Sequence, residues 1–255
     1  MSQRPRFLLP DWQAPAGVRA LSTLREGGVS APPWDSLNLG AHVGDAREAV
    51  LANRRRLREA AGLPAEPQWL EQVHGIAVAD LDQADCTRLA DAAVSSKPGC
   101  VCAVMTADCL PVVLASADGA VVGVAHAGWR GLAAGVIEAM LAAMRGKAAA
   151  GTAFQAWLAP AISAANFEVG DEVRAAFLAA DARAADAFER NAQGRWQCDL
   201  YQLARQRLDR AGVERIAGGG HCTYCEQSAF FSHRRDVQHR GLAATGRMAT
   251  LIWRT

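Results

Sequence analysis

Hydrophobic and polar residues alternate along the chain in two patterns, short apolar runs and longer amphipathic segments. The apolar runs predict strands at residues 17–24, 68–73, 76–80, 100–106, 110–116, 120–126, 155–159 and 247–254. The amphipathic segments predict helices at residues 46–62, 132–146, 171–181 and 200–212. Strands and helices interleave without a repeat or a linker, so we expect a single mixed α/β domain over residues 1–255.

A long segment between the first strand and the first helix has neither pattern. Residues 25–45 are rich in glycine and contain Pro32 and Pro33. A loop of this length is uncommon in a compact domain unless it serves binding, so we expect a binding loop. Asp45, at its end, is predicted to cap the helix that follows.

Charge and cysteine content exclude several classes of protein. The 27 basic and 26 acidic residues nearly balance, so the basic footprint of a nucleic-acid-binding protein is missing. The longest apolar stretches are too short for a membrane span, and Pro10 and Asp11 interrupt the only early one. Seven irregularly spaced cysteines do not form a disulfide framework. We expect a cytoplasmic monomer without a nucleic-acid or membrane partner.

Two histidines and one cysteine stand at the ends of three predicted strands. They are His74 in QWLEQVHG, Cys109 in AVMTADCLPV and His126 in VVGVAHAGWRG. Two imidazoles and a thiolate suit Zn²⁺, and three protein ligands leave one position open for water or substrate. A cysteine nucleophile, Cys109, activated by one histidine would need the same residue types. On the residues alone, both alternatives stay open.

Several polar residues in turn-like sequence are candidates for binding an anionic substrate. Arg25 precedes a Gly-Gly pair, Arg130 lies in GWRG, and Arg235 lies in FFSHRRD. An arginine can hold a phosphate through two parallel hydrogen bonds. With Asn38 of the long loop, these residues are the predicted substrate contacts. The competing interpretation is that the arginines pin loops through salt bridges.

A second cysteine motif, HCTYC at residues 221–225, resembles half of a zinc site. A structural zinc site needs a second ligand pair, and the remaining cysteines and histidines are irregularly placed. We therefore predict that Cys222 and Cys225 hold no second metal and form no obligatory disulfide.

These motifs together resemble a known family, the laccase-like multicopper polyphenol oxidase domain proteins, also called purine nucleoside phosphorylase or peptidoglycan editing factor proteins. The matching segments run from about residue 20 to the C-terminus and include QVHG, TADC, HAGWRG, CDLYQLARQRL, CTYC, FFSHRRD and TGRMATLIW. The resemblance implies a single-domain α/β/α fold with a layered mixed sheet, similar to the catalytic domain of cytotoxic necrotizing factor. It also implies a metal held by His74, Cys109 and His126. Ala159 and His233 depart from the residues common in the family.

The family's two names imply different chemistries. Laccase activity needs several copper ions, whereas this chain has six histidines and one convincing site. Met105, as an axial copper ligand, would lie roughly 13 Å from Cys109 along a strand. We therefore favour zinc-dependent phosphorolysis of adenosine, inosine and methylthioadenosine, with adenosine deamination as a side activity. Asp108 is the predicted acid/base or supporting residue.

Three alternatives to that function remain open. They are a copper-dependent polyphenol oxidase with Cu²⁺ in the site, an amidase that edits cell-wall precursors, and a non-catalytic metal-binding module.

Overall fold

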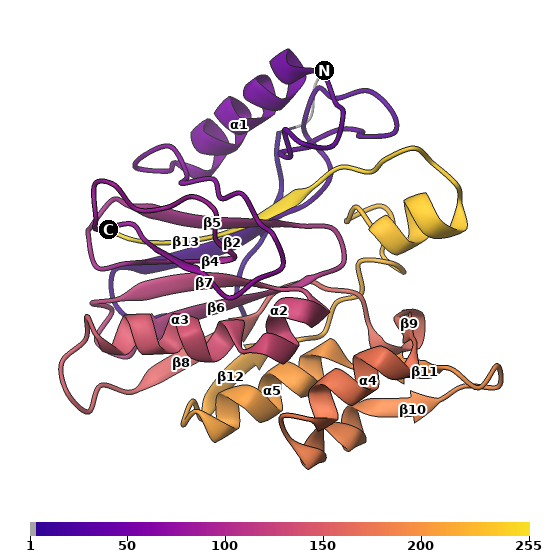
Figure 1. Cartoon of the computed structure of the whole chain (residues 1–255). Coiled ribbons are helices and arrows are strands. Elements are labelled where there is room, and N and C mark those ends of the chain that lie inside the picture. Colours follow the sequence, from indigo (N-terminus) through magenta and orange to yellow (C-terminus); the bar gives the residue numbers. More distant parts are fainter. Residues whose placement is uncertain (1–3) are drawn as a thin grey trace.

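The computed structural model describes residues 4–255 and contains two β-sheets stacked face to face (Figure 1). The four-stranded sheet consists, in order, of β1 (Phe7–Leu8), β2 (Val18–Thr23), β13 (Met248–Arg254) and β5 (Val101–Thr106). The six-stranded sheet consists of β12 (Arg215–Gly218), β8 (Phe154–Leu158), β6 (Leu110–Ser116), β7 (Val122–Ala127), β4 (Ala92–Ser95) and β3 (Val78–Asp80). A small third sheet joins β10 (Phe188–Arg190), β11 (Trp196–Cys198) and β9 (Glu168–Val169).

Helices cover both outer faces of the stacked sheets (Figure 1). Helix α1 (Arg47–Ala61) lies on the four-stranded sheet. The six-stranded sheet is covered by α2 (Trp129–Ala134), α3 (Val136–Arg145) and α5 (Leu200–Arg210), whereas α4 (Asp171–Leu178) packs on α2 and on β11 of the small sheet. Short 3₁₀ turns at Ala164–Asn166 and Ala182–Ala187 and a π-helical turn at Arg234–His239 complete the chain. Within residues 4–255, no helix combines the length and the apolar composition that a membrane span requires.

Strand β5 shows how the apolar runs of the sequence produce this layering. Val101, Ala103 and Met105 pack toward α1, whereas Cys102 and Val104 pack between the two sheets. Successive side chains of a strand point to opposite faces. A strand with both faces covered therefore reads as a continuous apolar run. The predicted mixed α/β fold is confirmed, and its β layer consists of two sheets where one was expected.

Some predicted elements differ in the structure. Residues 68–73 form only isolated bridges at Gln68 and Glu71, so His74 lies on a loop and not at a strand end. The helix expected at residues 132–146 is interrupted by Gly135, whose φ of 103° ends α2 and starts α3. Asp45 does not cap α1, because Ala46 is the N-cap residue and makes no side-chain cap. Asp45 instead accepts hydrogen bonds from side chains of the long loop.

Candidate metal centre

Three separate segments bring His74, Cys109 and His126 together. His74 lies on the loop before β3, Cys109 on the turn between β5 and β6, and His126 near the end of β7. Their ligand atoms all lie within 4.8 Å of one another, and Cys109 Sγ is 3.9 Å from His74 Nε2. Within residues 4–255 this is the only cluster of three or more such side chains placed to share an ion.

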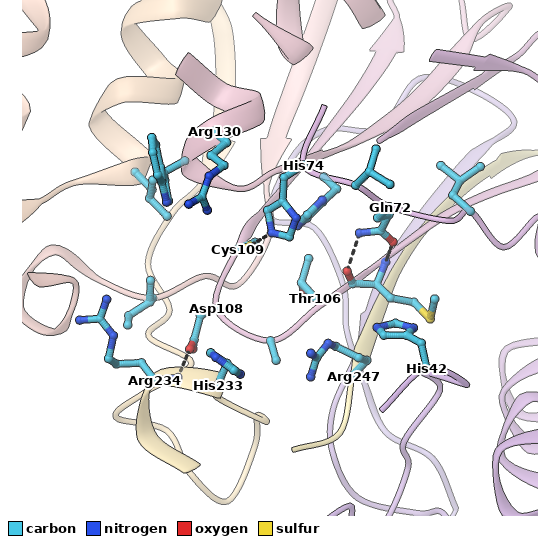
Figure 2. A pocket seen from close by; sticks show the side chains of 18 of the residues that line it. His42, Gln72, His74, Thr106, Asp108, Cys109, Arg130, His233, Arg234 and Arg247 are labelled. Carbon is cyan, nitrogen blue, oxygen red and sulfur yellow. Dashed lines mark hydrogen bonds between the residues drawn. The ribbon is translucent and has the colours of Figure 1, made fainter. Parts of the chain in front are cut away.

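Unusual backbone conformations direct these side chains inward. His74 has a φ of 62° and Asp108, beside Cys109, has a φ of 96°, in the left-handed region that non-glycine residues rarely adopt. The side chain of Gln72 fixes the first of these segments to β5 (Figure 2). Its Nε2 donates to the Met105 carbonyl and its Oε1 accepts from the Met105 amide, both at 2.8 Å. The loop therefore holds His74 in one place.

Gly128 of the HAGWRG motif lets the ligands approach the start of α2. A Cβ at this position would lie 2.8 Å from His74 Cδ2 and 3.1 Å from Cys109 Sγ. Any larger residue would displace the imidazole, so the glycine is required by the space around the ligands.

Asp91 supports two of the three ligands and was missed in the sequence analysis. Its carboxylate is fully buried, and Oδ1 accepts from His126 Nδ1 at 2.8 Å and from the His74 amide at 2.9 Å. Oδ2 accepts from the amides of Gly75 at 2.7 Å and Val73 at 3.2 Å. The bond to Nδ1 leaves His126 Nε2 free to face Cys109, the arrangement found for metal-binding histidines. The only sequence signal was an acidic residue directly before an apolar run.

The electrostatics of the cluster favour the thiolate. Burial acts to raise the pKa of Cys109, but the charge and hydrogen bonds of His126 and His74 outweigh it and lower the pKa to about 6. For His126, burial acts to lower the pKa, whereas Cys109 and Asp91 raise it to about 9. Because the thiolate is the form that binds metals and attacks electrophiles, Cys109 is prepared for either role at neutral pH.

The donor set fits a metal ion of the zinc or copper type. A tetrahedral zinc ion has bonds of about 2.0–2.3 Å, which place its ligand atoms roughly 3.3–3.8 Å apart. The 3.9 Å between Cys109 Sγ and His74 Nε2 is close to this spacing. A Cys109–His126–Asp91 chain also resembles the triad of thiol hydrolases. The second imidazole, that of His74, is the feature that favours ligation, because a thiol nucleophile does not need it.

The cluster lies in the wall of a cavity of about 640 Å³, a usual size for small-molecule sites. Trp129, Ile162 and Phe167 give part of the wall an apolar surface. Figure 2 shows Arg130 on one side of His74 and Cys109, and Arg247 with His42 on the other. The cavity therefore combines the His₂Cys cluster, an apolar wall and cationic groups.

Arg247 is the cationic residue that the sequence analysis missed. Its Nη1 donates to the carbonyls of Thr245 and Gly246, and no carboxylate among residues 4–255 lies within ion-pair distance of its guanidinium. Burial lowers its pKa, while Cys109 and Asp108 act in the opposite direction. Partial burial and the charge of Arg247 also lower the pKa of His42 and of His233. The guanidinium is thus available to an anionic ligand.

The predicted substrate contacts separate into two groups. Asp108 and Arg130 line the cavity, but the Asp108 carboxylate accepts from Thr223 Oγ1 and from the Arg234 amide, both at 2.7 Å. Arg25, Asn38 and Arg235 do not line it. Arg25 contacts the Asp35 and Gln227 carbonyls, Asn38 bridges Gly40, Asp45 and Arg247, and Arg235 is buried under three backbone carbonyls. Arg25, Asn38 and Arg235 therefore hold loop backbone in place and lie outside the cavity.

Replacing Arg235 by alanine is expected to destabilise the protein without weakening substrate binding. Its side chain is 4% exposed, and its guanidinium pairs with Asp236 at 2.8 Å and donates to the carbonyls of Thr223, Tyr224 and Phe230. Loss of one partner of a buried ion pair costs about 3–5 kcal/mol, measurable by urea denaturation. The control is Arg240→Ala, because the Arg240 side chain is 52% exposed. This substitution should change the free energy of unfolding by less than about 0.5 kcal/mol. Equal stabilities of the two variants would contradict this assignment.

Fold and site together define a mixed α/β protein with a His₂Cys centre in the wall of a cavity. The chain belongs to the family described as multi-copper polyphenol oxidoreductase laccase, whose model matches residues 19–255. The predicted family membership is therefore confirmed.

Named relatives and solved structures extend the similarity over nearly the full length. The Escherichia coli protein named purine nucleoside phosphorylase YfiH is 51% identical over 249 residues, which cover 97% of this chain and 98% of the relative. A Neisseria meningitidis crystal structure has 47% identity and a TM-score of 0.87, with 97% and 98% coverage. A Bacillus licheniformis hypothetical protein, also called YfiH, has 30% identity and a TM-score of 0.89, with 100% and 98% coverage.

Proposed function

We propose that the protein is a zinc-dependent purine nucleoside phosphorylase. It would cleave adenosine, inosine and methylthioadenosine to the free base and the sugar 1-phosphate. The observation that carries this proposal is the presence, in one cavity, of a three-ligand centre and of the Arg247 guanidinium, which has no carboxylate partner among residues 4–255. The activity named for the Escherichia coli relative supports it.

Cationic side chains on both sides of the metal-ligand cluster are suited to inorganic phosphate. Arg247 presents a guanidinium without a carboxylate partner among residues 4–255. Arg130 stacks on Trp129, with its Cζ 4.4 Å from the ring centroid. Arginine binds phosphate oxygens through charge-assisted hydrogen bonds. His42 and His233, kept neutral by their lowered pKa values, can exchange hydrogen bonds with ribose hydroxyls.

The apolar wall beside Arg130 is suited to a purine. Trp129, Ile162 and Phe167 form its apolar surface, and the guanidinium groups of Arg130 and Arg234 lie over the two aromatic rings. A purine can pack against this apolar surface or stack on the planar guanidinium groups. A zinc ion, when bound, supplies a Lewis acid that polarises an oxygen or lowers the pKa of water. Asp91 orients His126, and Asp108 holds the backbone of Arg234 against the cavity. His and Cys ligands also hold the zinc of nucleobase deaminases, which is why we include adenosine deamination as a side activity.

The copper-oxidase alternative fits the site less well. Multicopper oxidation requires several ions, and residues 4–255 contain one suitable cluster. A single blue-copper site adds a weak axial methionine. Met105 borders the cavity, but its side chain packs in the apolar cluster beneath α1, with 7% of its surface exposed, and it is not part of the ligand cluster.

The proposal is tested by incubating the zinc-loaded protein with inosine or adenosine over a range of phosphate concentrations. We expect free base and ribose 1-phosphate in equal amounts, at a rate that rises with phosphate. Inosine formed from adenosine without phosphate would report the deaminase activity. A rate of base release that does not depend on the phosphate concentration would indicate a hydrolase. Oxidation of phenolic dyes without nucleoside cleavage would indicate an oxidase.

Arg247→Met is expected to raise the phosphate concentration for half-maximal rate by about tenfold or more. Loss of a charge-assisted contact costs on the order of 1.5–3 kcal/mol, and about 1.4 kcal/mol corresponds to tenfold in affinity. Arg25→Met is the matched control, because Arg25 lies outside the cavity and contacts backbone carbonyls. It should leave the phosphate dependence unchanged. An equal shift in both variants would remove Arg247 from the phosphate site.

A further inference from the structure

Two thiols of the HCTYC segment form a cluster that the proposed chemistry does not use. Cys222 is half-buried, Cys225 is exposed, and neither is in a disulfide. Ser163 Oγ donates to Cys222 Sγ at 3.0 Å. The Asn166 side-chain amide lies 3.5 Å from Cys222 Sγ and 3.1 Å from Cys225 Sγ, so one donor bridges both sulfur atoms. Such donors stabilise sulfur in its anionic form.

The backbone already brings the two cysteines near each other. Residues 223–225 form a turn, closed by a hydrogen bond of 3.0 Å from the Glu226 amide to the Cys222 carbonyl. In a turn, Cα atoms three positions apart are less than about 7 Å apart. A disulfide spans Cα separations of about 4.4–6.8 Å. The side-chain amide of Asn166 lies within 3.5 Å of both sulfur atoms, so the two thiols face the same group and closing the bond requires little backbone movement.

The two thiols differ in reactivity. Partial burial acts to raise the pKa of Cys222, but hydrogen bonds from Ser163 and Cys225 outweigh it and lower the pKa. The hydrogen bond with Cys222 raises the pKa of Cys225. Cys222 is therefore the better nucleophile, and the exposed Cys225 is placed as its resolving partner.

We propose that Cys222 and Cys225 form a redox-active dithiol that hydrogen peroxide converts to a reversible intramolecular disulfide. The Cys222 thiolate attacks one peroxide oxygen, so that an S–O bond forms, the O–O bond breaks and hydroxide leaves. Cys222 sulfur is oxidised to sulfenic acid and the peroxide is reduced. The Cys225 sulfur then attacks Cys222 sulfur, the S–S bond forms, and the S–O bond breaks as hydroxide takes the thiol proton to give water.

The dithiol lies directly behind the cavity wall. Its hydrogen-bonding partners Ser163 and Asn166 follow and precede, in the sequence, two residues that line the cavity, Ile162 and Phe167. Thr223, between the two cysteines, donates to Asp108 at 2.7 Å. The modification would therefore occur next to the substrate site without involving a ligand of the metal centre.

The test is to treat the zinc-loaded protein with a small excess of hydrogen peroxide, block the remaining thiols and analyse tryptic peptides by mass. Residues 216–234 form one peptide, which contains both cysteines and no other. It should lose two hydrogen atoms about tenfold or more faster than the half-buried Cys86 is oxidised. Dithiothreitol should restore both thiols.

Two variants separate the roles of the cysteines. Cys225→Ser should stop at a sulfenic acid on Cys222 that dimedone traps, and Cys222→Ser should leave Cys225 reduced under the same treatment. Cys86→Ser is the matched control and should form the disulfide like the parent protein. Oxidation of Cys86 or Cys109 before the pair would overturn the proposal. So would a Cys225→Ser variant that dimedone does not label at Cys222.

Discussion

Replacing any one of His74, Cys109 and His126 by alanine is expected to abolish stoichiometric metal binding while the protein stays folded. The three residues lie on a loop, a turn and near a strand end, outside the apolar clusters that hold the layers together. A catalytic ion supplies several kcal/mol of transition-state stabilisation, and about 4 kcal/mol corresponds to a thousandfold. Nucleoside turnover should fall by that factor or more. Elemental analysis, circular dichroism and a turnover assay measure the three quantities.

Cys86→Ala is the control for these variants, because Cys86 lies outside the centre and should retain metal and activity. The variants also distinguish ligation from a thiol nucleophile. Full turnover by a metal-free His74→Ala variant would support the Cys109–His126–Asp91 chain as the catalytic group. Unfolding of all three variants on metal loss would mean that the ion is structural.

Asp91→Asn is expected to weaken zinc binding by about 10- to 100-fold, the usual effect of losing a residue that orients a ligand. In the parent protein all four hydrogen bonds to this side chain run from N–H groups to carboxylate oxygens. An asparagine has only one oxygen. It must therefore turn its NH₂ group either toward His126 and the His74 amide or toward the amides of Val73 and Gly75. Competition with a chromophoric chelator measures the zinc affinity.

The same substitution should lower stability, because at least two N–H groups lose the buried carboxylate oxygen as their acceptor, at about 1–3 kcal/mol each. Asp85→Asn, at an exposed position, is the control and should change neither quantity. An Asp91→Asn variant with parental zinc affinity would show that His74 and His126 keep their positions without this carboxylate.

Local pattern predicted much of the fold, because a buried strand and an amphipathic helix each leave a short-range signature. The apolar runs that became β5, β6 and β7 are examples. The stacking of two sheets has no such signature. It depends on β13 returning from the C-terminus to pair between β2 and β5, a contact between residues far apart in sequence. The strand prediction for residues 68–73 was wrong because these residues pack against the protein without a continuous partner strand.

The candidate site divides in the same way. His74, Cys109 and His126 could be predicted because histidine and cysteine beside turn residues are uncommon and chemically specific. Arg247 could not be predicted. From the sequence, an arginine at the start of a strand looks the same whether it faces solvent or a cavity. The role of Asp91 could not be predicted either. It depends on four N–H donors that the loop before β3 and strand β7 bring to its carboxylate only in the folded protein. Arg235 was predicted as a substrate contact because it lies in a turn-like sequence. Such a sequence does not reveal that backbone carbonyls surround the guanidinium.

The most direct test of the proposed reaction is to follow an isotope label from phosphate into the sugar product. The zinc-loaded protein is incubated with inosine and phosphate fully labelled with ¹⁸O, and the products are analysed by mass spectrometry. Phosphorolysis predicts ribose 1-phosphate that carries all of the phosphate label, because a phosphate oxygen forms the new bond to C1′. Free ribose with an oxygen from water, or no cleavage of the nucleoside at all, would contradict the account.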